Sequence, residues 1–158
     1  MNQTFASRLI AALNSEHTAL LNFVGLLERE QQMLVENLND RLLELSEQKS
    51  AEAVGLNALA QTRSAVLQEN IPQLNADSIN AWLAAHSREG LSIWQKILAL
   101  AKRSQQLNRA NGELIQMKLR HNQQSLAVLI NAANKANLYG PDGQPNISPG
   151  SGRSLGSG

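Results

Sequence analysis

The chain has 158 residues, which suits one domain or one domain with a tail, and its net charge at pH 7 is only +1. It contains no cysteine, which excludes disulfides, thiolate catalysis and Cys-ligated zinc. Apolar residues make up 42% of the chain but aromatic residues only 3%. Leu and Ala dominate the apolar set, and they are good helix formers, as are the abundant Gln, Glu, Lys and Arg. We therefore expect an all-α protein whose core is a thin seam between helices.

The net charge is close to zero, but acidic and basic residues are unevenly distributed along the chain. Residues 1–90 carry a net charge of −5, whereas residues 91–137 carry +6 with Glu113 as their only acidic residue. A basic helix could follow nucleic acid phosphates, but these charges are spread out and no aromatic residues interleave with them for stacking on bases. We expect the basic helix to pair with the acidic helices of its own chain, and we expect no nucleic acid partner.

Membrane insertion and secretion are not expected either. The first residues, Met-Asn-Gln-Thr-Phe, lack the charged and apolar regions of a signal peptide, and no apolar stretch is long enough to span a bilayer. The sequence therefore predicts a cytoplasmic protein.

The apolar spacing predicts four helices, at about 3–37, 41–69, 77–86 and 91–137. In the first, leucines recur every seven residues, at Leu13, Leu20, Leu27 and Leu34. Asn and Asp residues then break the pattern, and Asp40 is expected to cap the second helix.

The second predicted helix has an apolar face that Lys49, Glu52 and Arg63 interrupt, and it should end at Ile71-Pro72. Asp77 is expected to cap the third helix, and Gly90 to form the joint before the last one. The last helix would be roughly 70 Å long, against roughly 50 and 45 Å for the first two. Some of its apolar C-terminal end should therefore remain exposed, as a free arm of an elongated antiparallel bundle.

Several short segments of this chain, in this order and spacing, resemble the FlgN family of flagellar export chaperones. They are Glu47-Gln48-Lys49-Ser50 with Leu59 and Arg63; Trp94-Gln95; residues 107–112, LNRANG, with Leu114 and Ile115; residues 120–126, RHNQQSL; and residues 138–144, LYGPDGQ. The last segment is also a turn by its own chemistry, because Gly-Pro-Asp-Gly fixes one φ angle and supplies two residues that tolerate positive φ.

The resemblance implies a cytoplasmic chaperone that binds hook-filament junction proteins, of the FlgK and FlgL type, and delivers them to the export gate protein FlhA or other export apparatus components. It implies a helical chaperone domain at 1–143 and a flexible tail at 144–158, with no enzymatic activity and no cofactor. We expect export-gate docking at Leu138 and Tyr139, the second of which matches the tyrosine of the family's tail turn. The expected cargo-binding residues lie on the last helix: Asn108, Asn111, Asn122, Leu126, Leu129 and Ile130.

Two other hypotheses about the function remain open. His86-Ser87-Arg88-Glu89 resembles the phospho-accepting segment of histidine phosphotransfer bundles, although Glu89 stands where that motif has a cation. The chain could also be a generic coiled-coil interaction protein, and the sequence leaves open whether it forms a homodimer. A metal site is not expected, because His17, His86 and His121 lie on separate segments without suitably spaced partner ligands.

Overall fold

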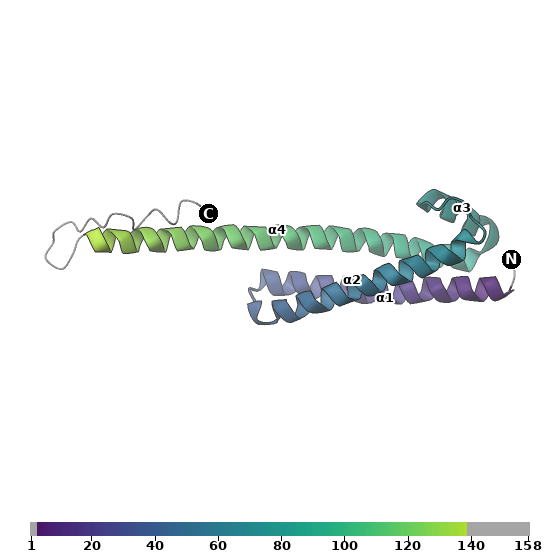
Figure 1. Ribbon diagram of the computed structural model, residues 1–158, viewed down its shortest axis with the longest axis horizontal. Helices are drawn as coiled ribbons and strands as arrows, with labels where there is room; N and C mark the ends of the chain where they lie inside the picture. The colour runs from purple at the N-terminus through teal and green to yellow at the C-terminus, as the bar shows by residue number, and fades with distance from the viewer. Residues whose placement is uncertain (1–2, 139–158) are drawn as a thin grey trace. The chain divides into compact units, whose positions relative to one another are not determined.

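The computed structural model describes residues 3–138, which fold into helices only (Figure 1). The elements in chain order are α1 (Gln3–Val35), the short 3-10 helix η1 (Asn39–Arg41), α2 (Leu42–Gln68), α3 (Ala76–His86) and α4 (Arg88–Leu138). The chain divides into two compact units, Met1–Leu114 and Ile115–Gly158, and α4 contributes to both. The predicted all-α fold with a long C-terminal helix is confirmed. The expected domain end at 143 and the tail at 144–158 lie outside the described residues and stay predictions.

In the first unit, α1 and α2 form an antiparallel hairpin (Figure 1). Arg8 near the start of α1 pairs with Glu69 just after α2, and Glu30 near the end of α1 pairs with Lys49 early in α2. Asn111 of α4 also bonds to Glu30, so the α4 segment of this unit lies along α1 as well. Among residues 3–138, no helix is both long and apolar enough to cross a membrane.

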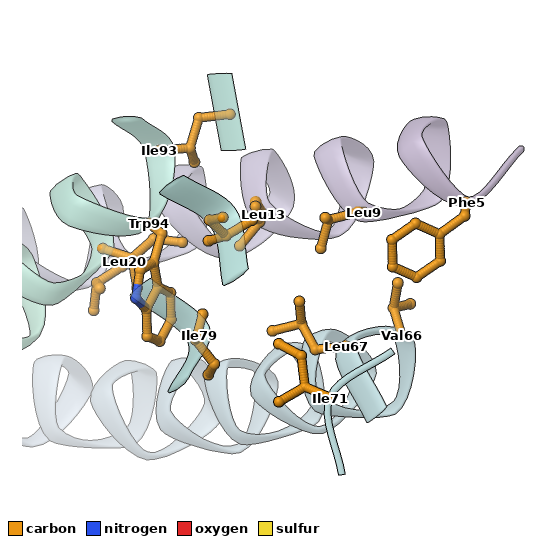
Figure 2. Packing of buried hydrophobic residues seen from close by; sticks show 12 residues of the cluster. Phe5, Leu9, Leu13, Leu20, Val66, Leu67, Ile71, Ile79, Ile93 and Trp94 are labelled. Carbon is orange, nitrogen blue, oxygen red and sulfur yellow. The ribbon is translucent and has the colours of Figure 1, made fainter. Parts of the chain in front are cut away.

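The heptad leucines of α1 are core residues. Leu13, Leu20, Leu27 and Leu34 are all buried, which confirms their predicted core role. The larger of two buried clusters lies toward the N-terminal end of α1, where α2, α3 and the start of α4 meet it (Figure 2). The smaller cluster joins α1 to the middle of α4. Its buried members are Val24, Leu27 and Leu107.

The turn between α1 and α2 is set by Asn37, which has a φ of 57°. This left-handed residue lets the Leu38 N–H bond to the Met33 carbonyl at 2.9 Å, the pattern of a Schellman helix end. The prediction that Asp40 caps the second helix is wrong. Asp40 belongs to η1, and α2 starts after Arg41 without a side-chain cap, because the 3-10 turn already satisfies part of the backbone there.

The prediction that Asp77 caps α3 is also wrong, by two residues. Asn75 is the cap, and its Oδ1 accepts a bond from the Ser78 N–H at 2.8 Å. The Ser78 hydroxyl accepts the Asn75 N–H at 3.0 Å in return, which completes a capping box. Asp77 lies in the first turn, where a carboxylate is favourable beside the helix dipole.

The joint between α3 and α4 lies at Ser87 and not at Gly90 as predicted. Ser87 is extended, with φ −152° and ψ 99°, and its hydroxyl accepts the Gly90 N–H at 3.0 Å. Gly90 lies within α4 and is buried. A Cβ there would come within 2.9 Å of the Ser87 Oγ and 3.1 Å of Leu83, so the glycine permits close packing and does not act as a hinge.

Candidate binding surface on helix α4

The hairpin seam contains a buried ion pair next to an aromatic ring. Arg63 of α2 donates a hydrogen bond to Glu16 of α1, and both side chains are largely buried. The Arg63 guanidinium also lies 4.9 Å from the centroid of the Trp94 ring, on α4. Burial raises the pKa of the Glu16 carboxyl above its ordinary 4.5, although Arg63 acts in the opposite direction. This contact fixes how the three helices meet.

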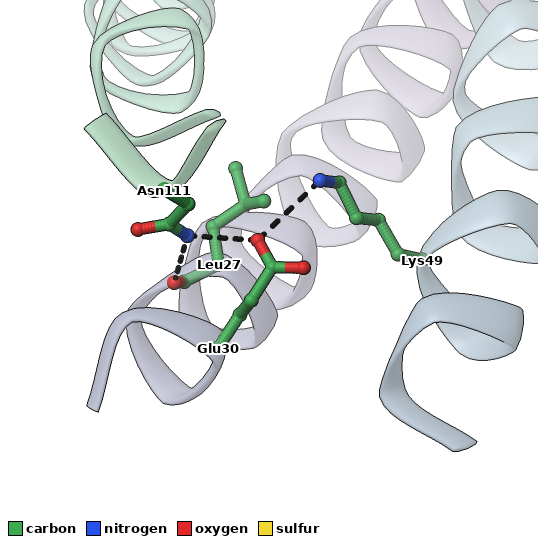
Figure 3. Close-up of polar contacts among 4 residues, drawn as sticks. All are labelled: Leu27, Glu30, Lys49 and Asn111. Carbon is green, nitrogen blue, oxygen red and sulfur yellow. Dashed lines mark hydrogen bonds and ion pairs between the residues drawn. The ribbon is translucent and has the colours of Figure 1, made fainter. Parts of the chain in front are cut away.

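A second polar contact joins the same helices closer to the hairpin turn (Figure 3). Asn111 donates hydrogen bonds to the Leu27 carbonyl at 2.9 Å and to the Glu30 carboxylate at 2.8 Å, and Lys49 approaches the same Glu30 oxygen at 3.4 Å. Asn111 is 1% exposed. Its amide is therefore an internal contact of the first unit, and we leave it out of the proposed cargo surface.

The sequence interpretation missed the two buried glutamates, although a spacing signal was present. Glu16 and Glu30 lie 14 positions apart on α1, and their partners Lys49 and Arg63 lie the same distance apart on α2. Opposite charges at equal spacing on two antiparallel helices predict matched pairs. The expected pairing of α4 with the acidic helices is seen at Arg103 and Glu28, whose charged groups lie 3.8 Å apart and are half exposed.

A groove in the first unit is lined in part by Lys49, which also approaches Glu30. It has a volume of about 390 Å³, and Phe23 contributes an aromatic ring to it. Asn108 is exposed and lines this groove, unlike its neighbour Asn111. The remaining lining residues are mostly small or polar: Ser46, Ser50, Ala53, Ser104 and Gln105.

In the second unit, α4 presents an exposed apolar stripe. Five positions follow each other at intervals of four, three, four and three residues, so they lie on one side of the helix. The exposed fractions are 40% for Ile115, 55% for Leu119, 57% for Leu126 and 67% for Leu129. Exposed Asn122 takes the middle position. We call these five residues, Ile115, Leu119, Asn122, Leu126 and Leu129, the arm stripe.

The other predicted site residues fall beside or beyond the arm stripe. Ile130 follows Leu129 and is half-buried. Met117 and Val128 are also exposed, but helical geometry places them on the opposite side of α4. Leu138 is the last residue of α4, and Tyr139 lies outside the described residues, so their expected gate contact stays a prediction.

His86, the candidate phosphate acceptor, is exposed at the last position of α3. Its ring stacks on Trp82 with centroids 4.4 Å apart, and its Nδ1 lies 2.8 Å from the Trp82 carbonyl oxygen. Ser87 interrupts the helix directly afterwards, so Glu89 belongs to α4. The resemblance to a phosphotransfer histidine depends on a charged residue three positions later on the same helix. Here His86 and Glu89 belong to two different helices, so that spacing is absent. Within residues 3–138, no three His, Asp or Glu side chains gather into a metal-binding group.

Comparison with known proteins gives a consistent result over nearly the whole chain. The FlgN family, described as FlgN protein, matches residues 1–147. The chain is 34% identical over 151 residues to a protein of Yersinia enterocolitica named flagella synthesis protein FlgN, covering 94% of this chain and 97% of that protein. The protein of the same name from Yersinia enterocolitica serotype O:8 / biotype 1B matches with the same identity and coverage. No solved structure matches the chain.

Proposed function

The chain belongs to the FlgN family, and from this we propose that it is a flagellar type III export chaperone. In this role it binds hook-associated proteins of the FlgK and FlgL type in the cytoplasm and delivers them to the export gate during flagellum assembly. The name of its Yersinia relatives, flagella synthesis protein, supports the broader assignment to flagellum assembly.

The observation that carries the chaperone proposal is the exposure of the arm stripe. Leu126 and Leu129 are 57% and 67% exposed on a helix whose upstream part buries Leu107 to 2%. Scattered exposed leucines are ordinary, but a row at coiled-coil spacing is the pattern that receives a partner helix. This stripe therefore supports capture of an amphipathic cargo helix.

Capture by a helix face suits an aggregation-prone cargo. Covering the apolar side of a cargo helix removes the surface through which cargo copies associate, and it requires no deep pocket. Binding and release can then follow the relative affinities of cargo for chaperone and gate, without ATP.

Asn108 and Ile130 remain proposed cargo contacts, before and after the arm stripe in the sequence. Leu138 and Tyr139 remain the proposed contacts for the gate protein FlhA.

Co-purification of hook-associated proteins with the purified chain tests the proposal. Leu126→Asp and Leu129→Asp should each abolish co-purification, because an unpaired carboxylate in an apolar contact costs a few kcal/mol. Gln124→Asp introduces the same charge on the opposite side of the helix and should bind cargo normally. Far-UV circular dichroism should show unchanged helicity in all three variants.

Three results would count against the proposal. Loss of helicity in the leucine variants would identify those side chains as internal core residues. Equal cargo binding by the leucine variants and Gln124→Asp would show that the arm stripe takes no part in capture. A hook-associated protein that never co-purifies with the wild-type chain would reject the chaperone function itself.

A further inference from the structure

The polar residue Asn122 lies in the middle of the arm stripe. Its neighbours in the stripe, Leu119 and Leu126, are 55% and 57% exposed, and Asn122 is exposed as well. A helix that docks on these leucines therefore removes water from the Asn122 amide. An amide that loses water without gaining a hydrogen-bond partner opposes docking. The occupant of the arm stripe consequently has to offer Asn122 a polar side chain.

The same helix shows how a buried asparagine of this kind is satisfied. Asn111, one turn before the start of the arm stripe at Ile115, is 1% exposed. Its amide donates hydrogen bonds to the Leu27 carbonyl and the Glu30 carboxylate of α1, and Lys49 of α2 lies 3.4 Å from that carboxylate. The helix that packs against this part of α4 thus supplies the polar partner, and a third helix supplies the compensating cation.

The charges of the arm favour a neutral partner over a carboxylate. A buried carboxylate needs a nearby cation, as the contact of Asn111 has in Lys49. Helical geometry places Arg120 and Lys135 on the side of α4 opposite the arm stripe, and Lys118 already has an interaction within the chain. Three further flanking side chains are uncharged: Gln116, Gln123 and Ser125. A neutral amide donates and accepts at once, so it fits the polar position of the stripe without burying a charge.

We propose that the occupant of the arm stripe is a cargo helix with one Asn or Gln in an otherwise apolar seam, placed so that this amide pairs with Asn122. The inference rests on the proposed function in taking cargo as the occupant, and it adds the residue type by which the cargo helix is recognised. Apolar residues three or four positions to either side of the cargo amide then meet Leu119 and Leu126.

A second copy of the chain also carries an asparagine at this level, but it fits the site less well. The two Asn122 side chains meet only when both α4 helices run parallel in the same register. In that alignment the sides of α4 that carry Asn111, one turn before the arm stripe, would also face each other. Asn111 is already buried and bonded to α1, which leaves no room for a second α4 there.

Two synthetic helical peptides test the pairing. They share one leucine seam and differ only at its central position, which is Asn in one peptide and Leu in the other. Binding of each to the full chain is followed by fluorescence anisotropy. The affinity for the Asn peptide divided by that for the Leu peptide should fall about tenfold from the wild type to Asn122→Leu, because the variant leaves the peptide amide without its partner. An unchanged ratio, or no measurable binding of either peptide to the wild type, would overturn the inference.

Gln124→Leu is the matched control for this measurement. It adds the same side chain on the opposite side of α4, so the ratio of the two affinities should equal that of the wild type. If Gln124→Leu lowers the ratio as much as Asn122→Leu does, the apolar character of the arm decides binding and the inference fails.

Sedimentation equilibrium tests the second copy as occupant. The wild-type chain should show no self-association that Leu126→Asp abolishes. A dimer that disappears in this variant would place a second copy on the arm stripe and overturn the inference. An unchanged affinity ratio, while hook-associated proteins still co-purify through Leu126 and Leu129, would reject only the pairing with Asn122. Absence of co-purification would reject the chaperone function instead.

Discussion

Asn111 of α4 and Glu30 of α1 are 81 positions apart in the sequence, yet the Asn111 amide donates a 2.8 Å hydrogen bond to the Glu30 carboxylate (Figure 3). Lys49 of α2 approaches the same carboxylate oxygen, so three helices meet at one charged group. A buried polar contact tolerates little sliding, because a shifted helix would leave the amide and the carboxylate unpaired. This contact therefore sets the register of the first part of α4 against the hairpin.

Asn111→Ala should lower the free energy of unfolding by about 1–3 kcal/mol, the cost of leaving a buried polar partner unsatisfied. Chemical denaturation measures this change. Asn108→Ala is the matched control, because Asn108 is exposed on the same helix, and it should change stability by less than about 0.5 kcal/mol. Cargo affinity should be unaffected by Asn111→Ala. A loss of cargo affinity without a loss of stability would show that Asn111 is a cargo contact, as the sequence predicted.

The heptad spacing was sufficient to predict α1 and its core leucines, but not the buried glutamates. Two core positions per heptad describe a helix with one neighbour, whereas α1 packs against both α2 and α4 and needs a wider buried face. Glu16, Phe23 and Glu30 form an additional row at seven-residue intervals along that face. Glu16 and Glu30 are buried there because cations from α2 meet them, which no local pattern on α1 reveals.

Helix boundaries were predictable to within a few residues, but the cap residues were not. Asp and Asn favour the cap position to a similar degree, so propensity alone cannot choose between Asn75 and Asp77. The choice depends on the reciprocal hydroxyl of Ser78, three residues after the cap. Gly90 was predicted to be a joint, but it permits close packing against Ser87. The sequence alone does not distinguish these two uses of a glycine. The exposure of Leu126 and Leu129 was easier to predict, because α4 is longer than α1 and α2.

Asn122→Leu should tighten binding of a matched all-leucine helical peptide but weaken discrimination between peptide registers. Asn122 is the polar member of the arm stripe, and a polar residue at a seam position specifies register at a cost in stability. Fluorescence anisotropy should show about tenfold tighter binding to the leucine peptide, the scale of one improved seam contact. A peptide shifted by one heptad should bind the variant almost as well as the matched one. Unchanged affinity for both peptides would mean that Asn122 does not face the partner.

Tyr139→Ala should weaken binding to the gate protein FlhA by about 2 kcal/mol, the scale of an interface hot spot. A tyrosine offers a large contact area with two side-chain torsions to order and a hydroxyl to direct. Cargo affinity and melting temperature should barely change, because the proposed capture uses the helix upstream. Both affinities can be measured on purified proteins by calorimetry. An equal loss of gate and cargo binding, or a clear fall in melting temperature, would identify Tyr139 as a structural cap.

The pH dependence of stability should contain two opposing contributions. Burial raises the pKa of Glu16 above 4.5, so between 4.5 and the raised value the folded state binds more protons than the unfolded state. In that window Glu16 increases the free energy of unfolding as pH falls. The hydrogen bond from Arg8 lowers the pKa of Glu69, so its contribution is present above pH 4.5 and is lost as pH falls below it.

Glu16→Gln and Glu69→Gln separate the two contributions, because each amide keeps the shape of the side chain but does not titrate. Urea unfolding between pH 3 and pH 7 should show that Glu16→Gln loses stability more steeply than the wild type on mild acidification. Glu69→Gln should instead lose less stability than the wild type below pH 4.5. The Arg8–Glu69 pair is exposed, so added salt should reduce its contribution more than that of the largely buried Glu16. A Glu16→Gln profile parallel to that of the wild type above pH 4.5 would show that pairing with Arg63 cancels the effect of burial.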